Sequence, residues 1–191
     1  MEDTLLIGKV IGSKEHFRYQ VSVYAEGEVA PLPHEPSLGE FVSIGNRKNR
    51  IFGLITSTYL LSEENMGLYR FSKEDMKIFT PELINDPGYY LVVNGIGQQE
   101  KNWMKTGIPT KSPELNDPVY LMSDHEIRSL HLSRGELSIE YLPPLLSSEN
   151  PEIKAAVTEA LRKLSHLLTE HREVINLLRS EMEWNNKVRW N

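Results

Sequence analysis

Hydrophobic positions follow two different periods along this chain of 191 residues. In the first part, short apolar runs alternate with turn residues. Residues 5–11 are almost continuously apolar, and residues 17–24 alternate apolar with polar side chains, which is the period of a half-buried strand. Residues 41–44 and 51–58 are further apolar runs, separated by a polar, charged loop that is typical of a hairpin. The pattern predicts β structure in this part of the chain.

A second group of short elements follows these strands. Residues 59–88 are rich in polar turn residues, so we expect a loop with one short helix there. Residues 89–96 and 119–122 return to apolar runs that predict strands. Residues 123–126 (Ser-Asp-His-Glu) fit a capping box, in which the Ser and Glu side chains satisfy free backbone donors of a first helical turn. A short helix should follow and end near His131.

The apolar period changes to that of a helix in the last third of the chain. Asn150 supplies an N-cap, and Pro151 fits the first helical position. Neither glycine nor a further proline occurs from there to Trp184, and apolar residues recur at intervals of three and four, the spacing of a coiled-coil seam. The pattern predicts a single amphipathic helix to about residue 184, about 50 Å long at roughly 1.5 Å per residue.

Composition indicates a soluble globular protein, with 39% apolar and 25% charged residues. The chain has no cysteine, which excludes disulfides, thiolate zinc sites and cysteine nucleophiles. No apolar run approaches the roughly 18 residues of a membrane span, and the N-terminus (Met-Glu-Asp-Thr) is acidic where a signal peptide would be basic. We therefore expect a cytoplasmic protein without a membrane partner.

Charge is distributed unevenly, which bears on nucleic-acid binding. Residues 1–150 hold 21 acids against 14 bases, and residues 151–191 hold six acids against seven bases. An acidic barrel is poorly suited to neutralise phosphates. Arg47, Lys48 and Arg50 nevertheless form a local basic cluster at the expected hairpin tip, where they could touch phosphate or an acidic partner. A nucleic-acid-binding barrel, using this loop and the aromatic residues Tyr89, Tyr90 and Trp103, is thus the alternative function.

No catalytic, cofactor or metal site is expected from the motifs. Lys111-Ser112 lacks the glycines of a phosphate-binding loop, and Pro109 removes one backbone donor. The histidines of the short helix and of the long one are spaced by six and by five residues, which does not place two imidazoles on one helical face. His171 falls in the apolar seam, where we expect it to pack with a hydrogen-bonded partner or to tune the oligomeric state. An enzyme with an unrecognised pocket is a third, less favoured class.

Several short motifs share the order and spacing of one barrel family. They are the opening strand with Gly8 and Gly12, residues 38–42 (Leu-Gly-Glu-Phe-Val), residues 51–55 (Ile-Phe-Gly-Leu-Ile), the approach from Pro109 to Tyr120, and the helix start at 123–127. With them, residues 5 to about 130 resemble the HAS-barrel of HerA-type translocases and of the N-terminal domains of ATP synthase α and β subunits. In that family the barrel crowns an ATPase ring, and the HerA type works with the NurA nuclease in DNA end processing.

The resemblance implies a small closed antiparallel β-barrel with a short helix, and the apolar period of the last third adds a long C-terminal α-helix. Together they predict a mainly β fold with α. We expect the barrel and short helix over residues 1–135, a proline-containing linker over 136–150, and the amphipathic helix with a tryptophan-containing tail over 151–191. Where a P-loop ATPase would begin in the family, this sequence has Tyr-Leu-Pro-Pro-Leu-Leu at 141–146. We therefore expect a non-catalytic assembly or adaptor protein, serving a HerA-like ATPase in trans.

The long helix is the expected interaction surface. A small barrel is about 30 Å across, so part of a 50 Å stripe (about 1.5 Å per residue) should contact a partner protein or a second copy. Packing entirely within its own chain is the competing arrangement. The residues assigned to the interface are Leu161, Leu164, Leu168, Ile175, Leu178, Met182, Trp184 and Trp190.

Overall fold

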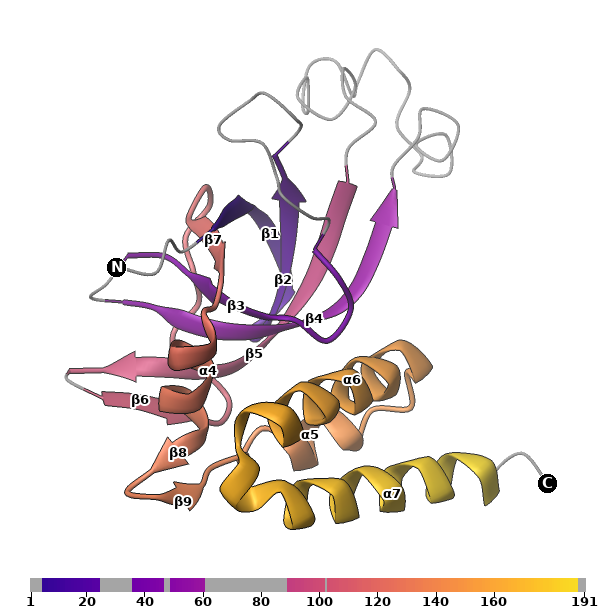
Figure 1. Ribbon diagram of the computed structural model, residues 1–191. Coiled ribbons are helices and arrows are strands. Elements are labelled where there is room, and N and C mark those ends of the chain that lie inside the picture. The colour runs from indigo at the N-terminus through magenta and orange to yellow at the C-terminus, as the bar shows by residue number, and fades with distance from the viewer. Residues whose placement is uncertain (1–4, 25–35, 47–48, 61–88, 102, 189–191) are drawn as a thin grey trace.

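Six strands close into an antiparallel barrel in the computed structural model of the chain, which describes residues 5–24, 36–46, 49–60, 89–101 and 103–188 (Figure 1). The strands are β1 (Leu6–Glu15), β2 (Arg18–Val23), β3 (Phe41–Ile44), β4 (Ile51–Leu60), β5 (Tyr89–Glu100) and β7 (Pro118–Leu121). Their order is β2-β1-β7-β3-β4-β5, and pairing of β2 with β5 closes the ring. The expected closed barrel is confirmed. The short helix expected within 59–88 lies outside the described residues.

The interior of the ring is filled by alternating side chains, as the period of residues 17–24 predicts. Tyr19 and Val21 of β2 pack with Leu91 and Val93 of β5 in one buried apolar cluster. Each apolar side chain that is fully buried contributes roughly 1.5–3 kcal/mol. A slip of one residue would turn all of them outward, so burial fixes the register of this pair.

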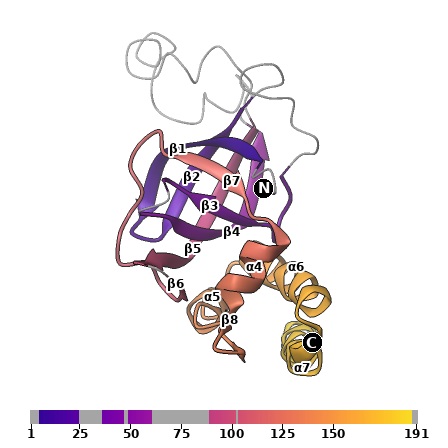
Figure 2. The same cartoon turned by 60° about the vertical axis from the view of Figure 1, so that its left-hand side comes forward.

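A second apolar core lies between the barrel wall and the helices. Outward-facing Phe41, Phe52 and Leu54 share it with buried residues of α4 (Asp124–His131), α5 (Leu142–Leu146) and α6 (Pro151–Leu167). Figures 1 and 2 show these helices gathered on one side of the barrel. Residues 136–150, expected as a linker, contain α5 and β9 (Glu136–Leu137), which pairs with β8 (Leu132–Ser133). This segment is therefore part of the helical layer.

The C-terminal part is a helical hairpin and not a single helix. α6 ends at Leu167, and the φ and ψ of its C-cap Leu168, −106° and 68°, lie outside the helical region. A short 3-10 turn, η1 (Thr169–His171), leads into α7 (Arg172–Val188), which folds back along α6. The helical type of the segment is confirmed, whereas its expected continuity is wrong. Within the described residues, no helix is long and apolar enough to cross a membrane.

Burial and capping at the turn explain why the helix breaks without glycine or proline. A straight helix would carry Ile175 roughly 16 Å beyond Leu164 at about 1.5 Å per residue, away from the core. In the hairpin, both side chains are fully buried in the same core. The carbonyl groups left free at the end of α6 accept hydrogen bonds from arginines: Arg172 donates to Ser165 O at 3.1 Å, and Arg128 donates to Leu167 O. These tertiary contacts stabilise a turn that the local sequence does not mark.

Candidate interaction surface

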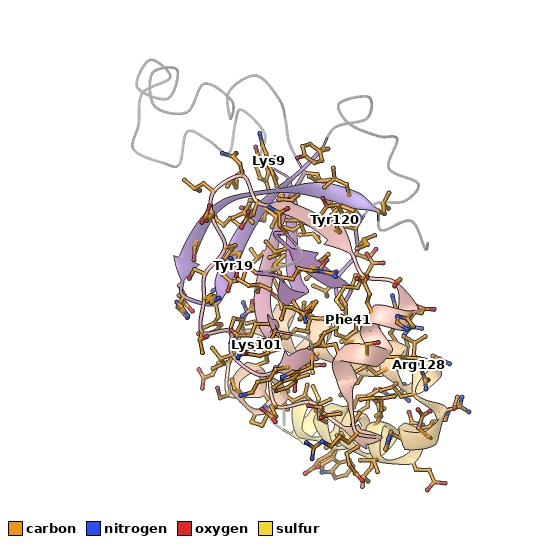
Figure 3. All side chains as sticks on the ribbon, turned by 90° about the vertical axis from the view of Figure 1, so that its left-hand side faces the viewer. Lys9, Tyr19, Phe41, Lys101, Tyr120 and Arg128 are labelled. Carbon is orange, nitrogen blue, oxygen red and sulfur yellow. The ribbon has the colours of Figure 1, made fainter. Side chains whose placement is uncertain are left out.

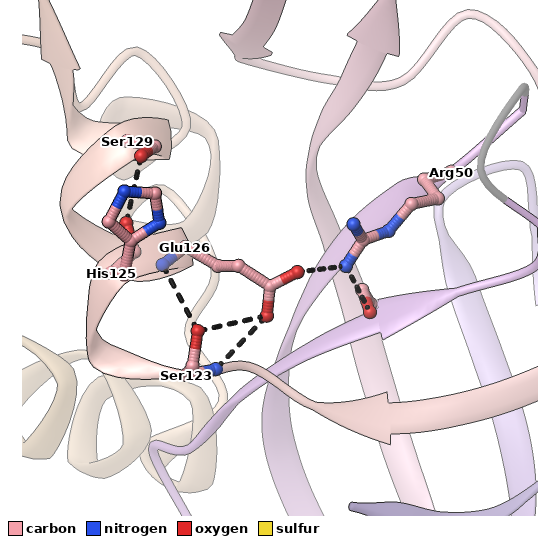
Figure 4. Close-up of polar contacts among 6 residues, drawn as sticks. Arg50, Ser123, His125, Glu126 and Ser129 are labelled. Atoms are coloured by element: carbon pink, nitrogen blue, oxygen red, sulfur yellow. Dashed lines mark hydrogen bonds and ion pairs between the residues drawn. The ribbon is translucent and has the colours of Figure 1, made fainter. Parts of the chain in front are cut away.

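Arg50, expected as a phosphate or acidic-partner contact, is engaged inside the fold. Its guanidinium donates to Glu126 Oε1 at 2.5 Å and to Ser43 Oγ at 2.9 Å (Figure 4). It also lies 5.5 Å from the centre of the Phe52 ring. Both members of the ion pair are largely buried, with side-chain exposures of 18% and 15%. Arg50 thus ties the start of β4 to α4, which uses its guanidinium inside the fold. Arg47 and Lys48 lie outside the described residues.

Glu126 has two structural roles. It completes the expected capping box: its backbone N–H donates to Ser123 Oγ, and its carboxylate accepts the Ser123 N–H at 3.1 Å. Burial alone would raise the pKa of this carboxyl, but hydrogen bonds from Arg50 and Ser123 outweigh it, so the pKa lies below its usual value. An ionised Glu126 therefore holds both the helix start and the arginine.

The Lys111-Ser112 segment lies against the tip of the β3–β4 hairpin. Lys111 Nζ donates to Asn49 Oδ1 at 3.3 Å, beside an open depression of about 900 Å³ that Glu114 and Asp117 also line. Asp117 Oδ2 accepts the Glu114 backbone N–H at 2.8 Å, so this donor is already used. Carboxylates and occupied N–H groups do not form a phosphate cradle. Among the described residues, no cluster of three His, Cys, Asp or Glu side chains could hold a metal.

Two histidines serve structural contacts. His131 is fully buried; its Nδ1 lies 2.8 Å from Ile127 O and its Nε2 lies 2.8 Å from the Tyr141 hydroxyl. Burial lowers the pKa of His131 to about 4, so the imidazole is neutral, with Nδ1–H donating and Nε2 accepting. His171 Nε2 lies 3.0 Å from Gly135 O at the helical turn, which agrees with the expected hydrogen-bonded packing.

Most of the expected interface residues are inside the chain. Leu161, Leu164, Leu168 and Ile175 are fully buried in the helical core, and Leu178 and Met182 pack against it. The assignment of the first four to a partner surface is therefore corrected, since their own chain covers them. Trp184 is 68% exposed, and Trp190 lies outside the described residues.

The outward face of α7 presents a different apolar stripe. Val174 is 52% exposed and Leu177 is 69% exposed, and both share this face with Trp184. The intervals of three and seven residues place the three side chains along one side of the helix. In Figure 2, α7 is seen nearly end-on as the outermost helix, beyond α6. Leu177 was not predicted as an interface residue, because one continuous apolar stripe was expected along residues 151–184. A separate helical period that begins after Leu168 places Leu177 on the outward face of α7.

The aromatic residues that the nucleic-acid alternative requires do not form one platform. Tyr90 is buried and stacks on Tyr59, with ring centres 5.6 Å apart. Trp103 is exposed, on the separate strand β6 (Trp103–Thr106). Single-strand binding relies on neighbouring exposed aromatics in a basic groove. The described residues therefore give this alternative no specific support.

These features define a protein built from a closed six-stranded antiparallel barrel with a helical cover on one side. The family described as "Domain of unknown function (DUF8166)" matches residues 1–190, so the chain belongs to this family. No curated protein matches the sequence.

Proposed function

We propose that this protein is a non-catalytic assembly or adaptor protein that docks on another protein through the outward face of α7. The observation that carries the proposal is the stripe of Val174, Leu177 and Trp184. Of the six large apolar side chains strongly exposed among the described residues, three lie on this single helix face. Contiguous exposed apolar groups, especially with a tryptophan, are typical of protein–protein contacts.

The inner face of the same helix supports this role. Ile175 is fully buried and Leu178 and Met182 pack on the helical core, so α7 is already held without its outer residues. The exposed leucine and valine would each gain roughly 1.5–3 kcal/mol if a partner buried them fully. A helix held from behind presents these groups in a fixed arrangement, which lowers the entropy lost on binding.

The partner that we propose is a HerA-like ATPase acting in trans. The proposal rests on the resemblance of residues 5 to about 130 to the HAS-barrel, and the closed antiparallel ring is compatible with it. The sequence holds no G-x-x-x-x-G-K-[ST] motif, so nucleotide hydrolysis would belong to the partner. In such a complex the barrel would position the protein on the ATPase and contact its subunits, and α7 would supply the docking contact.

Co-expression with the HerA-type ATPase of the source organism tests the proposal. We expect the two proteins to co-elute in size-exclusion chromatography with light scattering, and a Leu177→Glu/Trp184→Glu variant to bind at least about 100-fold more weakly, since each lost contact of about 1.4 kcal/mol is tenfold. Ile108→Glu/Leu115→Glu is a matched control, because it changes two exposed apolar residues elsewhere. This control should bind like the wild type.

The same measurement separates the two parts of the proposal. If the wild type forms a homodimer and the α7 variant is a monomer, the outward face of α7 is a docking face, but its partner is a second copy of this chain and not the ATPase. An ATPase complex that the α7 variant leaves intact would overturn the docking face. A wild-type protein that neither self-associates nor binds the ATPase would overturn both.

A further inference from the structure

β6 is the only strand of the seven-stranded sheet that lies outside the closed ring, at the end of the sheet order. It pairs with β5 in the register Gln98 to Lys105 and Gln99 to Met104. Gly107 N–H donates to Ile96 O, and hydrogen-bonded pairs alternate along an antiparallel ladder, so Lys105 bonds to β5 and Met104 directs its N–H and C=O away. Within the described residues, no backbone hydrogen bond of a turn, loop or cap involves these two groups of Met104.

A groove of about 620 Å³ lies beside β6, between this strand and the end of α4 with β8 and the turn that follows it. Trp103, 54% exposed, and partly buried Met104 line it from β6, and Leu132, Ser133 and Arg134 line it from the other side. The volume lies in the range of roughly 300–1,000 Å³ that is typical of ligand sites. The groove thus combines apolar surface, a tryptophan and unpaired backbone groups.

Arg134 is the charged residue among those that line the groove, and two lysines lie on or next to β6. Lys101 at the β5–β6 turn, Lys105 on the same face of β6 as Trp103, and Arg134 are all exposed. Figure 3 views the face that carries Lys101. Two acids are also near: Glu100 accepts a hydrogen bond from Gln98 Nε2 at 2.5 Å, and exposed Glu136 pairs in register with Ser133. Arg134 in the lining, with the two lysines, is therefore the cation that a carboxylate of a ligand would meet.

We propose that this groove binds an extended, acidic segment of a partner protein, which adds a strand to β6. Its backbone would pair with the N–H and C=O of Met104, as in other cases of strand addition to a sheet edge. An apolar side chain would lie on Trp103 and Leu132, and a carboxylate would meet Arg134. Pairing with β6 of a second copy is disfavoured, because it would bring the lysines on and next to β6 of the two molecules together.

Peptides selected from a displayed library of random linear peptides on the full-length chain test the groove. We expect the enriched peptides to be acidic. Their affinity should fall about tenfold on Met104→Pro, because proline lacks the backbone N–H and blocks the added strand. Proline is tolerated at an edge position whose N–H does not bond within the sheet, so β5–β6 pairing should persist. Met104→Leu keeps the N–H and should bind like the wild type.

Two further measurements make the result independent of the proline. Amide exchange at Met104 in the wild type should slow when peptide is bound. Arg134→Glu should lower the affinity for the peptides about tenfold, whereas Lys111→Glu, which changes an exposed cation between β6 and β7 outside the groove lining, should not. The Leu177→Glu/Trp184→Glu variant should retain peptide binding, which separates this site from α7.

Several results would contradict the proposal that this groove binds an acidic segment. These are the absence of enriched peptides, enrichment of basic peptides, binding that Arg134→Glu leaves unchanged, or an unprotected Met104 amide in the complex. Tighter binding of a single-stranded oligonucleotide than of any selected peptide, lost on Arg134→Glu, would replace the acidic segment by nucleic acid.

Discussion

At the scale of single residues, the buried imidazole of His131 links stability to pH. Burial lowers its pKa from 6.5 to about 4 in the folded chain, while the unfolded chain keeps the ordinary value. As the pH falls from 6.5 to 4, the unfolded state therefore binds a proton that the folded state does not. The free energy of unfolding falls across this window, by up to roughly 3 kcal/mol. Above pH 6.5 both states are neutral at this position, and the effect vanishes.

His131→Gln should remove this dependence, because glutamine keeps an acceptor for the Tyr141 hydroxyl and does not titrate. We expect urea unfolding of the wild type to lose roughly 2–3 kcal/mol between pH 6.5 and 4.5, and the variant to lose much less. The stabilisation from Glu126, whose folded pKa is lowered, is complete above 4.5 and is lost only below it, so this window isolates the histidine. Exposed His125→Gln is the control and should follow the wild type; equal slopes for all three proteins would contradict the prediction.

At the scale of elements, α6 packs so closely on the turn before β3 that only glycine fits there. Gly39 has a φ of +83°, and a Cβ at this position would lie 2.6 Å from Glu159 Cβ and 2.9 Å from Ala156 O. A Cβ at this position would fit only if the backbone of α6 moved away. The short distance between α6 and the barrel therefore depends on the absence of a side chain at Gly39.

Gly39→Ala should separate α6 from the barrel locally and cost about 2–4 kcal/mol, of which roughly 1–2 is backbone strain and the remainder steric overlap. Gly135→Ala is a matched control, since its φ of +86° carries the same strain while nothing lies within 4 Å of the added Cβ. Urea unfolding of both variants measures the difference. An equal loss of unfolding free energy in the two variants would show that α6 does not restrict the space at Gly39.

At the scale of the whole molecule, the helical hairpin decides which apolar face is core and which is surface. Leu164 of α6 is fully buried, and Leu177 of α7 is 69% exposed. The two residues are alike in the sequence and belong to apolar stripes of similar spacing. Only the fold-back at Leu168 places them on opposite sides of the layer.

Leu164→Ala should therefore cost roughly 2–5 kcal/mol, whereas Leu177→Ala should stay within about 0.5 kcal/mol. Thermal unfolding of the two variants is the measurement. Because Leu164 is buried, Leu164→Glu would unfold the protein whether or not it binds a partner. Association is therefore tested at the exposed residues Leu177 and Trp184. Similar unfolding temperatures for the two alanine variants would contradict the hairpin packing.

Elements whose causes are local could be predicted from the amino-acid sequence alone. The alternation in residues 17–24 gave β2 and its inward face, and the Ser123–Glu126 capping box gave the start of α4. Trp184, predicted as an interface residue, is exposed in the structure, and its role as an anchor stays a prediction. For β2 and α4, a period or a cap within a few residues specifies the outcome.

The tertiary structure decided what depends on contacts between distant segments. The turn at Leu168 is held by Arg128 and Arg172 and by the shared burial of Leu164 and Ile175, and no glycine or proline marks it. Likewise, Arg50 looked free in a basic loop but pairs with Glu126, 76 positions away. Local propensity cannot encode such pairings, because their free energy exists only once the barrel and the helices have met.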